Sequence, residues 1–139
     1  MSLSIRNQLS GTVRSVSTGE VMALVRVRLD GGQEITAAVT REAVGQLELT
    51  EGTQVRALIK STEVALATGG VEGLSIRNRL PGTVTDVSAG GAMAGVKVTV
   101  AGGELTAAIT RDAAEDLGLA AGSEVTALIK STEIALAAA

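Results

Sequence analysis

The sequence predicts an all-β protein built from two tandem copies of a small five-stranded barrel, each with one short helix. Two observations lead to this prediction. Apolar and polar residues alternate along much of the 139-residue chain, as they do in half-buried strands. The first half of the chain also recurs in the second half, at an offset of 71 residues that becomes 70 further along. The repeated segments are residues 3–7 with 74–78, 11–13 with 82–84, 36–38 with 106–108, and 57–63 with 127–133.

The repeat divides the chain into a first module over residues 1–68, a linker over 69–73 and a second module over 74–139. The linker contains three glycines, a composition typical of a loop. Gln33 has no counterpart in the second copy, so we expect one extra residue in a turn of the first copy. Because only two copies are present, the pattern indicates duplication of a compact unit rather than a solenoid.

The order of expected elements within one copy is strand, strand, strand, helix, strand, strand, which is typical of an OB-like barrel. Residues 21–29 alternate with period two, and residues 30–32 (Asp-Gly-Gly) then supply a turn. Thr40 is suited to cap the short helix, and Thr110 repeats this signal in the second copy. The other expected elements of the first copy are an opening strand that contains residues 4–7, strands over 34–39, 55–59 and 64–66, and the helix over 40–47.

The composition excludes several classes of function. The chain contains no Cys, no His and no aromatic residue, and its formal net charge is −3. Without Cys and His it lacks the commonest nucleophiles, bases and transition-metal ligands. Without aromatic rings or an excess of positive charge, binding of nucleic acid is disfavoured. No segment is apolar for long enough to act as a signal peptide or to span a bilayer, so we expect a cytoplasmic protein with no membrane partner.

The small size of each unit predicts association. A unit of about 65–70 residues lies near the lower limit for independent stability. Its core contains only Val, Leu, Ile and Ala, without the large buried area of an aromatic ring and without a disulfide. Closing an interface would bury more apolar surface and cover the edge strands. We therefore expect a homo-oligomer with the binding site at an interface.

The first candidate motif is Ser4-Ile5-Arg6-Asn7, which opens the first copy. On an extended strand, Ser4 and Arg6 face one side while Ile5 and Asn7 face the other. One face thus presents a hydroxyl and a guanidinium together, and the apolar face anchors them. The alternative interpretation is an exposed edge strand with solvated polar residues.

The second candidate motif is Lys60-Ser61-Thr62-Glu63, which interrupts an apolar run between two expected strands. A tight turn at this place leaves consecutive backbone N–H groups free to form a concavity that binds anions. The lysine adds a positive charge, and the two hydroxyls add donors. The alternative interpretation is an ordinary polar turn.

Both motifs recur unchanged in the second copy, whereas most other charged positions differ between the copies. Arg14, Arg28 and Arg56 of the first copy correspond to Thr85, Thr99 and Thr126 of the second. This difference favours the binding interpretation of both motifs. The candidate site residues are therefore Ser4, Arg6, Asn7, Lys60, Ser61 and Thr62, with Ser75, Arg77, Asn78, Lys130, Ser131 and Thr132 in the second copy.

A site rich in cations, hydroxyls and N–H donors suits a ligand that carries negative charge and only accepts hydrogen bonds. Fully ionised tetrahedral dianions such as molybdate, tungstate and sulfate fit this description, and cavity size decides between them. Phosphate keeps a proton near neutral pH, which Glu63 or Glu133 could accept in a hydrogen bond, so phosphate remains open as a ligand.

Arg41 and Arg111, each beside an acidic residue, are interpreted as solvated helix starts. Because no carboxylates show metal-binding spacing and no nucleophile has an activating base, we expect neither a metal site nor catalysis.

The motif pair, with Gly11 and Val13 following the first motif, resembles the molbindin family of small Mop or TOBE-type molybdate-binding domains. The resemblance covers essentially the whole chain, and both motifs occur twice at this spacing. It implies an OB-like fold, a trimer of the tandem protein, and molybdate or tungstate bound between neighbouring modules. It also implies that the oxyanion is held by Ser4, Arg6, Lys60 and Ser61, and in the second copy by Ser75, Arg77, Lys130 and Ser131.

The family often has Ala where this chain has Ile5 and Ile76, a position that we expect to face away from the ligand. No DNA-binding or ATPase motif accompanies the modules, unlike the repressors and transporters that carry similar domains. We therefore expect storage and homeostasis of the oxyanion, with no catalysis and no resident cofactor. The alternatives are an OB-type nucleic-acid-binding module and a structural interaction module in which the motifs serve only as turns.

Overall fold

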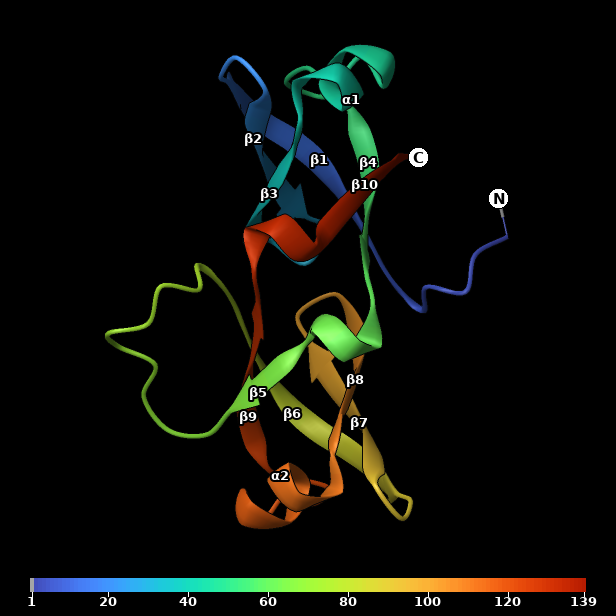
Figure 1. Ribbon diagram of the computed structural model, residues 1–139, viewed down its shortest axis with the longest axis vertical. Helices are drawn as coiled ribbons and strands as arrows, with labels where there is room; N and C mark the ends of the chain where they lie inside the picture. The colour runs from blue at the N-terminus through green and yellow to red at the C-terminus, as the bar shows by residue number, and fades with distance from the viewer. Residues whose placement is uncertain (1) are drawn as a thin grey trace.

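The computed structural model describes residues 2–139 and contains two curled five-stranded sheets stacked end to end (Figure 1). Each sheet carries one short helix at the end that is remote from the other sheet (Figure 1). The first sheet contains β1 (Asn7–Thr18), β2 (Met22–Leu29), β3 (Glu34–Thr40) and β4 (Gln54–Ile59), with helix α1 (Arg41–Gln46). The second sheet contains β6 (Asn78–Ala89), β7 (Met93–Val100), β8 (Gly103–Thr110) and β9 (Glu124–Ile129), with helix α2 (Arg111–Asp116).

The two copies exchange their last strands. After β4 the chain passes through the 3₁₀ turn η1 (Ser61–Glu63) into β5 (Ala65–Ala67), which pairs antiparallel with β9 of the second copy. After β9 it passes through η2 (Ser131–Glu133) into β10 (Ile134–Ala138), which pairs antiparallel with β4 of the first copy. Figure 1 shows the green and red segments crossing between the two sheets. We call the region where they cross, residues 60–64 and 130–134, the waist.

The strand orders are β10-β4-β1-β2-β3 and β5-β9-β6-β7-β8. The predicted fold class, two all-β five-stranded units with one short helix each, is confirmed. The exchange differs from the expectation that each module folds on itself. The boundaries 1–68, 69–73 and 74–139 describe the sequence repeat, whereas each folded sheet combines strands from both modules. The repeat cannot reveal this because β5 and β10 are both short and apolar and follow the same motif.

The core of each sheet is aliphatic. Every second side chain of β2 from Ala23 to Leu29 is buried and the alternate ones are exposed, as the period-two pattern predicts. Val21 differs from this prediction because it precedes the strand and is 71% exposed. Burial of one large aliphatic side chain contributes about 1.5–3 kcal/mol. The largest fully buried side chains are Ile35, Ile59, Leu80, Leu105 and Ile129.

Both helices begin as the sequence predicts. The Oγ1 atoms of Thr40 and Thr110 accept hydrogen bonds from the N–H groups of Ala43 and Ala113, each at 3.1 Å. Such a cap contributes about 1 kcal/mol to helix stability. Each helix is six residues long, and none among residues 2–139 is long and apolar enough to cross a membrane.

The turn between β2 and β3 holds the extra residue of the first copy. The N–H of Leu29 donates to the carbonyl oxygen of Gln33 at 2.7 Å, which encloses residues 30–32. In the second copy Val100 pairs directly with Gly103, so only residues 101–102 form the turn. The predicted position of the insertion is confirmed.

The opening motif lies outside the strand that was expected to contain it. β1 begins at Asn7, which pairs with Ile59, and the chain leaves β4 directly after Ile59 as it enters η1. Residues 3–6 are therefore not paired with a strand. The expected alternation still holds in their exposure, since Ser4 and Arg6 are exposed while Ile5 is half-buried.

Candidate oxyanion site

The two motifs of each copy emerge from the same end of one strand pair. Asn7 opposite Ile59 is the last residue pair between β1 and β4. Arg6 directly precedes this pair and Lys60 directly follows it, so the two cations leave the sheet side by side. The second copy repeats the arrangement at the equivalent end of β6 and β9. Strand register therefore brings together two motifs that lie more than fifty residues apart in sequence.

Strand exchange adds the corresponding turn of the other copy. The turn η1 packs on β8, and η2 packs on β3. A hollow of about 150 Å³ is lined by Ile5 and Lys60 of the first copy and by Thr132 of the second. Its counterpart, of about 280 Å³, is lined by Ile76, Lys130 and Thr62. A lysine of one copy and a threonine of the other thus share each hollow, which sequence spacing alone cannot show.

Two further pairs of side chains line these hollows. Ile5 lines one hollow with Lys60, and Ile76 lines the other with Lys130. Glu63 and Glu133 line both hollows, so negative charge stands next to the lysines. These carboxylates provide acceptors for a ligand that carries a proton.

The cations of both motifs are exposed and unpaired. Within residues 2–139, the side-chain hydrogen bonds of arginines belong to Arg56, Arg79 and Arg111, and the ion pair belongs to Arg111. In the same part of the chain, the N–H groups of Ser61 and Thr62 have no acceptor. The groups that remain available to a ligand therefore include the side chains of Arg6, Lys60, Arg77 and Lys130.

Asn7 and Asn78 are buried, and each joins the two copies. The side-chain oxygen of Asn7 accepts from the N–H of Thr106 at 2.8 Å, and its Nδ2 donates to the carbonyl of Thr106 at 2.8 Å. Asn78 pairs in the same way with Thr36, at 2.8 and 2.9 Å. Each amide therefore pairs like a short strand with an edge strand of the other sheet, β8 or β3.

The asparagines thus have a structural role that the sequence analysis missed. Their link to the candidate site is one long contact, 3.5 Å from Asn78 Nδ2 to Ser131 Oγ. The signal that could have revealed the role is the alternation itself, which places Asn7 on the same face as Ile5. A polar residue on an apolar face needs a buried partner.

Both repeats match the model of one domain family, the TOBE domain, over residues 3–66 and 74–136. The chain belongs to the TOBE domain family. The matched ranges end within β5 and β10, so each TOBE repeat includes the strand that it donates to the other sheet.

Named relatives of this TOBE protein are molybdenum proteins. The chain is 44% identical to the molybdenum-pterin-binding protein MopB of Rhodobacter capsulatus over 136 residues, which is 96% of this chain and 50% of MopB. It is 41% identical to molybdenum-pterin-binding protein 3 of Clostridium pasteurianum over 66 residues, 48% of this chain and 97% of that protein. The chain spans about half the length of MopB and of the other long curated relatives that it matches.

The tandem TOBE architecture also matches a solved structure over its full length. The structure is that of the cytoplasmic molybdate-binding protein ModG in a form with molybdate bound, with a TM-score of 0.96 and 37% sequence identity. The match covers 100% of both chains. The fold seen here is therefore that of ModG from one end to the other.

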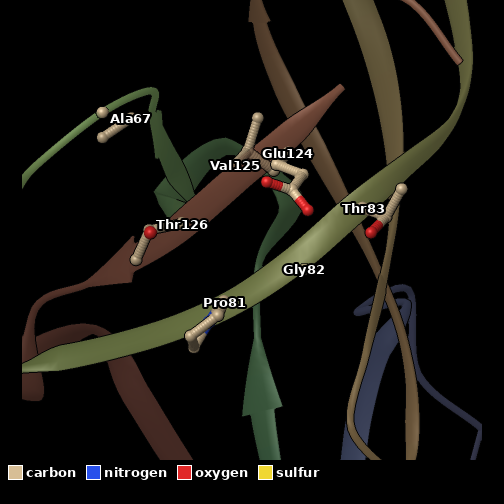
Figure 2. Close-up of a pocket in the computed structure, with 8 residues that line it drawn as sticks. Ala67, Pro81, Gly82, Thr83, Glu124, Val125 and Thr126 are labelled. Atoms are coloured by element: carbon tan, nitrogen blue, oxygen red, sulfur yellow. The ribbon is translucent and has the colours of Figure 1, made fainter. Parts of the chain in front are cut away.

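A larger hollow, of about 510 Å³, lies in the second TOBE repeat away from the motifs (Figure 2). Pro81 of β6 and Val125 of β9 line it, with Ala67 at one side. The residues that line it include Glu124 but no lysine or arginine, so it offers no cation to hold an oxyanion. Size does not single it out either, since a hollow beside Val21 and Arg41 has the same volume of about 510 Å³.

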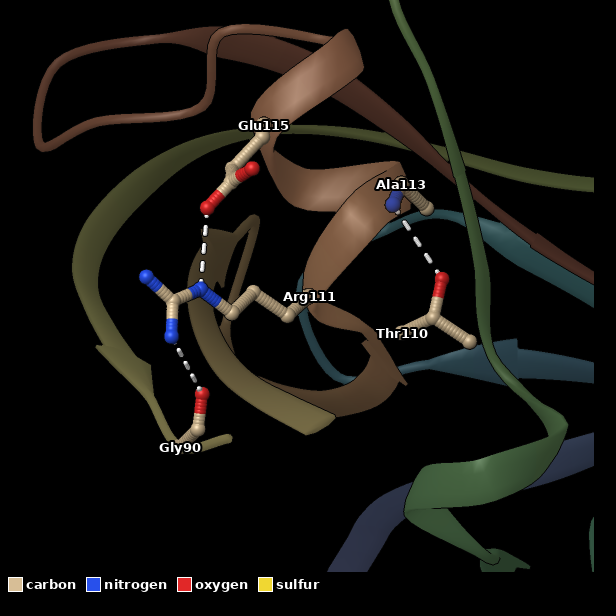
Figure 3. A network of polar contacts seen from close by, with 5 residues as sticks. All are labelled: Gly90, Thr110, Arg111, Ala113 and Glu115. Carbon is tan, nitrogen blue, oxygen red and sulfur yellow. Dashed lines mark hydrogen bonds and ion pairs between the residues drawn. The ribbon is translucent and has the colours of Figure 1, made fainter. Parts of the chain in front are cut away.

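Arg111 at the start of α2 serves the local structure, as expected for a solvated helix start. Figure 3 shows its guanidinium between two acceptors. Nε donates to Glu115 Oε1 at 2.9 Å, and Nη1 donates to the carbonyl oxygen of Gly90 at 3.2 Å. Both side chains of the ion pair are about half exposed or more, at 48% and 61%. The pair contributes little stability because water screens it.

Proposed function

We propose that this protein binds molybdate or tungstate reversibly and without catalysis, and that it stores the oxyanion in the cytoplasm. One observation carries the proposal. Two exposed and unpaired cations lie together at the end of each strand pair next to the waist, Arg6 with Lys60 and Arg77 with Lys130. The similarity to ModG and to the molybdenum-pterin-binding proteins supports molybdate as the oxyanion and the cytoplasm as the location.

The proposed ligand set in the first copy is Ser4, Arg6, Lys60 and Ser61, with the N–H groups of η1 as further donors. The second copy supplies Ser75, Arg77, Lys130 and Ser131. A tetrahedral dianion accepts hydrogen bonds at every oxygen, so a set made only of donors and cations satisfies it. Thr62 and Thr132 each line the hollow that contains the lysine of the other copy. We leave Asn7 and Asn78 out of the set because their amides pair with Thr106 and Thr36.

We also propose that the sites are completed by association into a trimer, with the oxyanion between neighbouring modules. In the single chain the cations are exposed, so bulk water screens their attraction for an anion. A neighbouring chain would exclude that water and strengthen each charged hydrogen bond. Sedimentation equilibrium at micromolar concentration should give three times the mass of the chain, and a monomeric mass would contradict the trimer.

The test of the proposed function is the double variant Lys60→Ala with Lys130→Ala. Each site loses one charge-assisted hydrogen bond to the oxyanion, which contributes about 1.5–3 kcal/mol. The affinity for molybdate should therefore fall at least tenfold. Titration calorimetry with molybdate measures this. Lys97→Ala, which removes an exposed lysine from β7, is the matched control and should bind as the wild type does. Equal affinity of the double variant and the wild type would remove the lysines from the site.

The purely structural alternative is favoured by one observation, namely that the Lys-Ser-Thr-Glu turns form the crossings of the strand exchange. The two interpretations give different results in dialysis. Purified protein equilibrated with molybdate and then dialysed should retain molybdenum in elemental analysis. Loss of all molybdenum would favour a structural module.

A further inference from the structure

We propose that Arg79 in the second copy and Gln8 in the first are positioning residues for the Ser-Ile-Arg segments, and that the second copy therefore provides the tighter oxyanion site. Both residues lie directly after Asn, outside the motifs, and they occupy the same position in the repeat. The inference rests on the proposed function for its ligand, but its structural part can be tested without any ligand.

The segments that carry the serine and the arginine are not held by a strand ladder. Residues 3–6 and 74–77 precede β1 and β6, and the opposite strands end level with Asn7 and Asn78. Besides the half-buried apolar side chains, local hydrogen bonds to their backbone hold these segments in place. The two copies differ in those bonds.

In the second copy one guanidinium holds the segment at two points. Arg79 Nε donates to the carbonyl oxygen of Ile76 at 2.9 Å, and its Nη2 donates to the carbonyl oxygen of Leu74 at 2.7 Å. These two carbonyls lie on either side of Ser75, and Arg77 follows directly. Arg79 is half-buried, which shields both bonds from water. The planar guanidinium fixes its donors relative to one another, so it sets the path of the backbone as well as its distance.

In the first copy the same position holds the segment at one point. Gln8 Nε2 donates to the carbonyl oxygen of Ile5 at 3.0 Å, and its Oε1 accepts from Arg56 Nη1 at 3.1 Å. Gln8 is exposed, so water competes for these bonds. Thr126 takes the place of Arg56 in the second copy. Each copy thus has one arginine in these hydrogen bonds, Arg56 or Arg79, but only Arg79 donates directly to the backbone of the segment.

The difference in bonding leads to a difference in affinity. An oxyanion that binds the first-copy segment must order a backbone that is held at one point, and the lost freedom weakens binding. The second-copy segment is already fixed on both sides of its serine. With one or two hydrogen bonds at stake, we expect the two classes of site to differ about fivefold in dissociation constant.

The experiment exchanges the two sets of residues in the full chain. Arg79→Gln with Thr126→Arg gives the second copy the residues of the first, and Gln8→Arg with Arg56→Thr does the reverse. In molybdate titrations the first exchange should weaken the tighter class about fivefold, and the second should strengthen the weaker class. The exchange leaves the net charge unchanged, and Arg111→Gln, at the start of α2 and remote from the waist (Figure 1), is the control for loss of an arginine elsewhere. An isotherm of the first exchange that equals that of Arg111→Gln would overturn the inference.

Hydrogen exchange of the ligand-free protein tests the positioning role separately. Amides of residues 74–77 should be protected more strongly than those of residues 3–6. Arg79→Gln should remove that difference while leaving the urea midpoint of unfolding unchanged, and Arg79→Lys, which keeps the charge without the fork, should not restore it. Equal protection of the two segments in the wild type would overturn the inference. A wild type that binds no molybdate at all, but shows the unequal protection, would instead reject the proposed function.

Discussion

The two copies of this protein differ on their outer faces and agree where they meet. Arg14 and Arg28, at exposed strand positions of the first copy, correspond to Thr85 and Thr99 of the second, whereas the asparagines that join the sheets are present in both. Outer positions contact water, where a change of charge costs little stability. The asparagines contact the other copy, so a change there leaves buried backbone groups without partners.

Strand exchange explains why the contacts between copies come in matched pairs. The asparagine contacts and the strand pairings that the first copy makes with the second are also made in the opposite direction, as Asn7 with Thr106 and Asn78 with Thr36 show. The comparison of the copies therefore separates residues that join the two sheets from residues that change the stability only slightly. Three comparisons, each of two substitutions, sharpen that separation.

The largest effect is expected for Asn7→Ala. The substitution removes both hydrogen bonds to Thr106 at an edge strand, so the free energy of unfolding should fall by about 2–3 kcal/mol. Asn78→Ala should cost the same within experimental error because its two bonds are equivalent. Urea denaturation measures both, with Ser10→Ala on the exposed face of β1 as the control. If Asn7→Ala cost no more than Ser10→Ala, the pairing would contribute nothing.

A smaller effect is expected at the hairpin tips, which touch where the two copies meet. A Cβ on Gly31 would lie 2.2 Å from the carbonyl oxygen of Ala101, so Gly31→Ala forces two backbones apart and should cost about 2 kcal/mol. The adjacent Gly32 has a φ of +97° but open space around it, so Gly32→Ala should cost only about 1 kcal/mol. Thermal unfolding of the two variants compares them. A greater loss of stability for Gly32→Ala than for Gly31→Ala would show that the two hairpin tips separate at little cost.

The smallest effect concerns the residue that directly follows Leu47 or Leu117 at the end of each helix. Glu48 has a φ of +52°, and the equivalent Gly118 has a φ of +61°. A residue with a Cβ is strained in this region, so Glu48→Gly should stabilise the protein by about 0.5–1 kcal/mol. Gly118→Ala should destabilise it by a similar amount. Urea unfolding that shows Glu48→Gly to be less stable than the wild type would contradict the assignment of strain.

Local features could be predicted from the sequence because their causes are local. The cap at Thr40, the alternation of β2 and the extra residue near Gln33 each depend on neighbours within a few positions, and the structure has all three. The residues of the candidate site could be chosen for their chemistry. Their juxtaposition at the ends of the strand pairs then follows from the register of β1 against β4.

The remaining features depend on contacts between the copies, which a repeat cannot specify. Two identical turns followed by two short apolar strands fit either sheet, so the sequence does not say which strand completes which sheet. The role of Asn7 was hidden for the same reason, since its partner Thr106 lies 99 residues away. The one difference next to the motif, Gln8 against Arg79, becomes meaningful only when the acceptors of both side chains are known.

Covalent linkage of the copies changes the conditions under which the sheets can form. A single copy separated from its neighbour would leave one edge of β4 or β9 open and would have to obtain its fifth strand from another molecule. Assembly of that kind weakens on dilution. In the tandem chain the donor strand is tethered, with an effective concentration on the order of millimolar. The completed sheets should therefore survive dilution to concentrations at which separate copies would come apart.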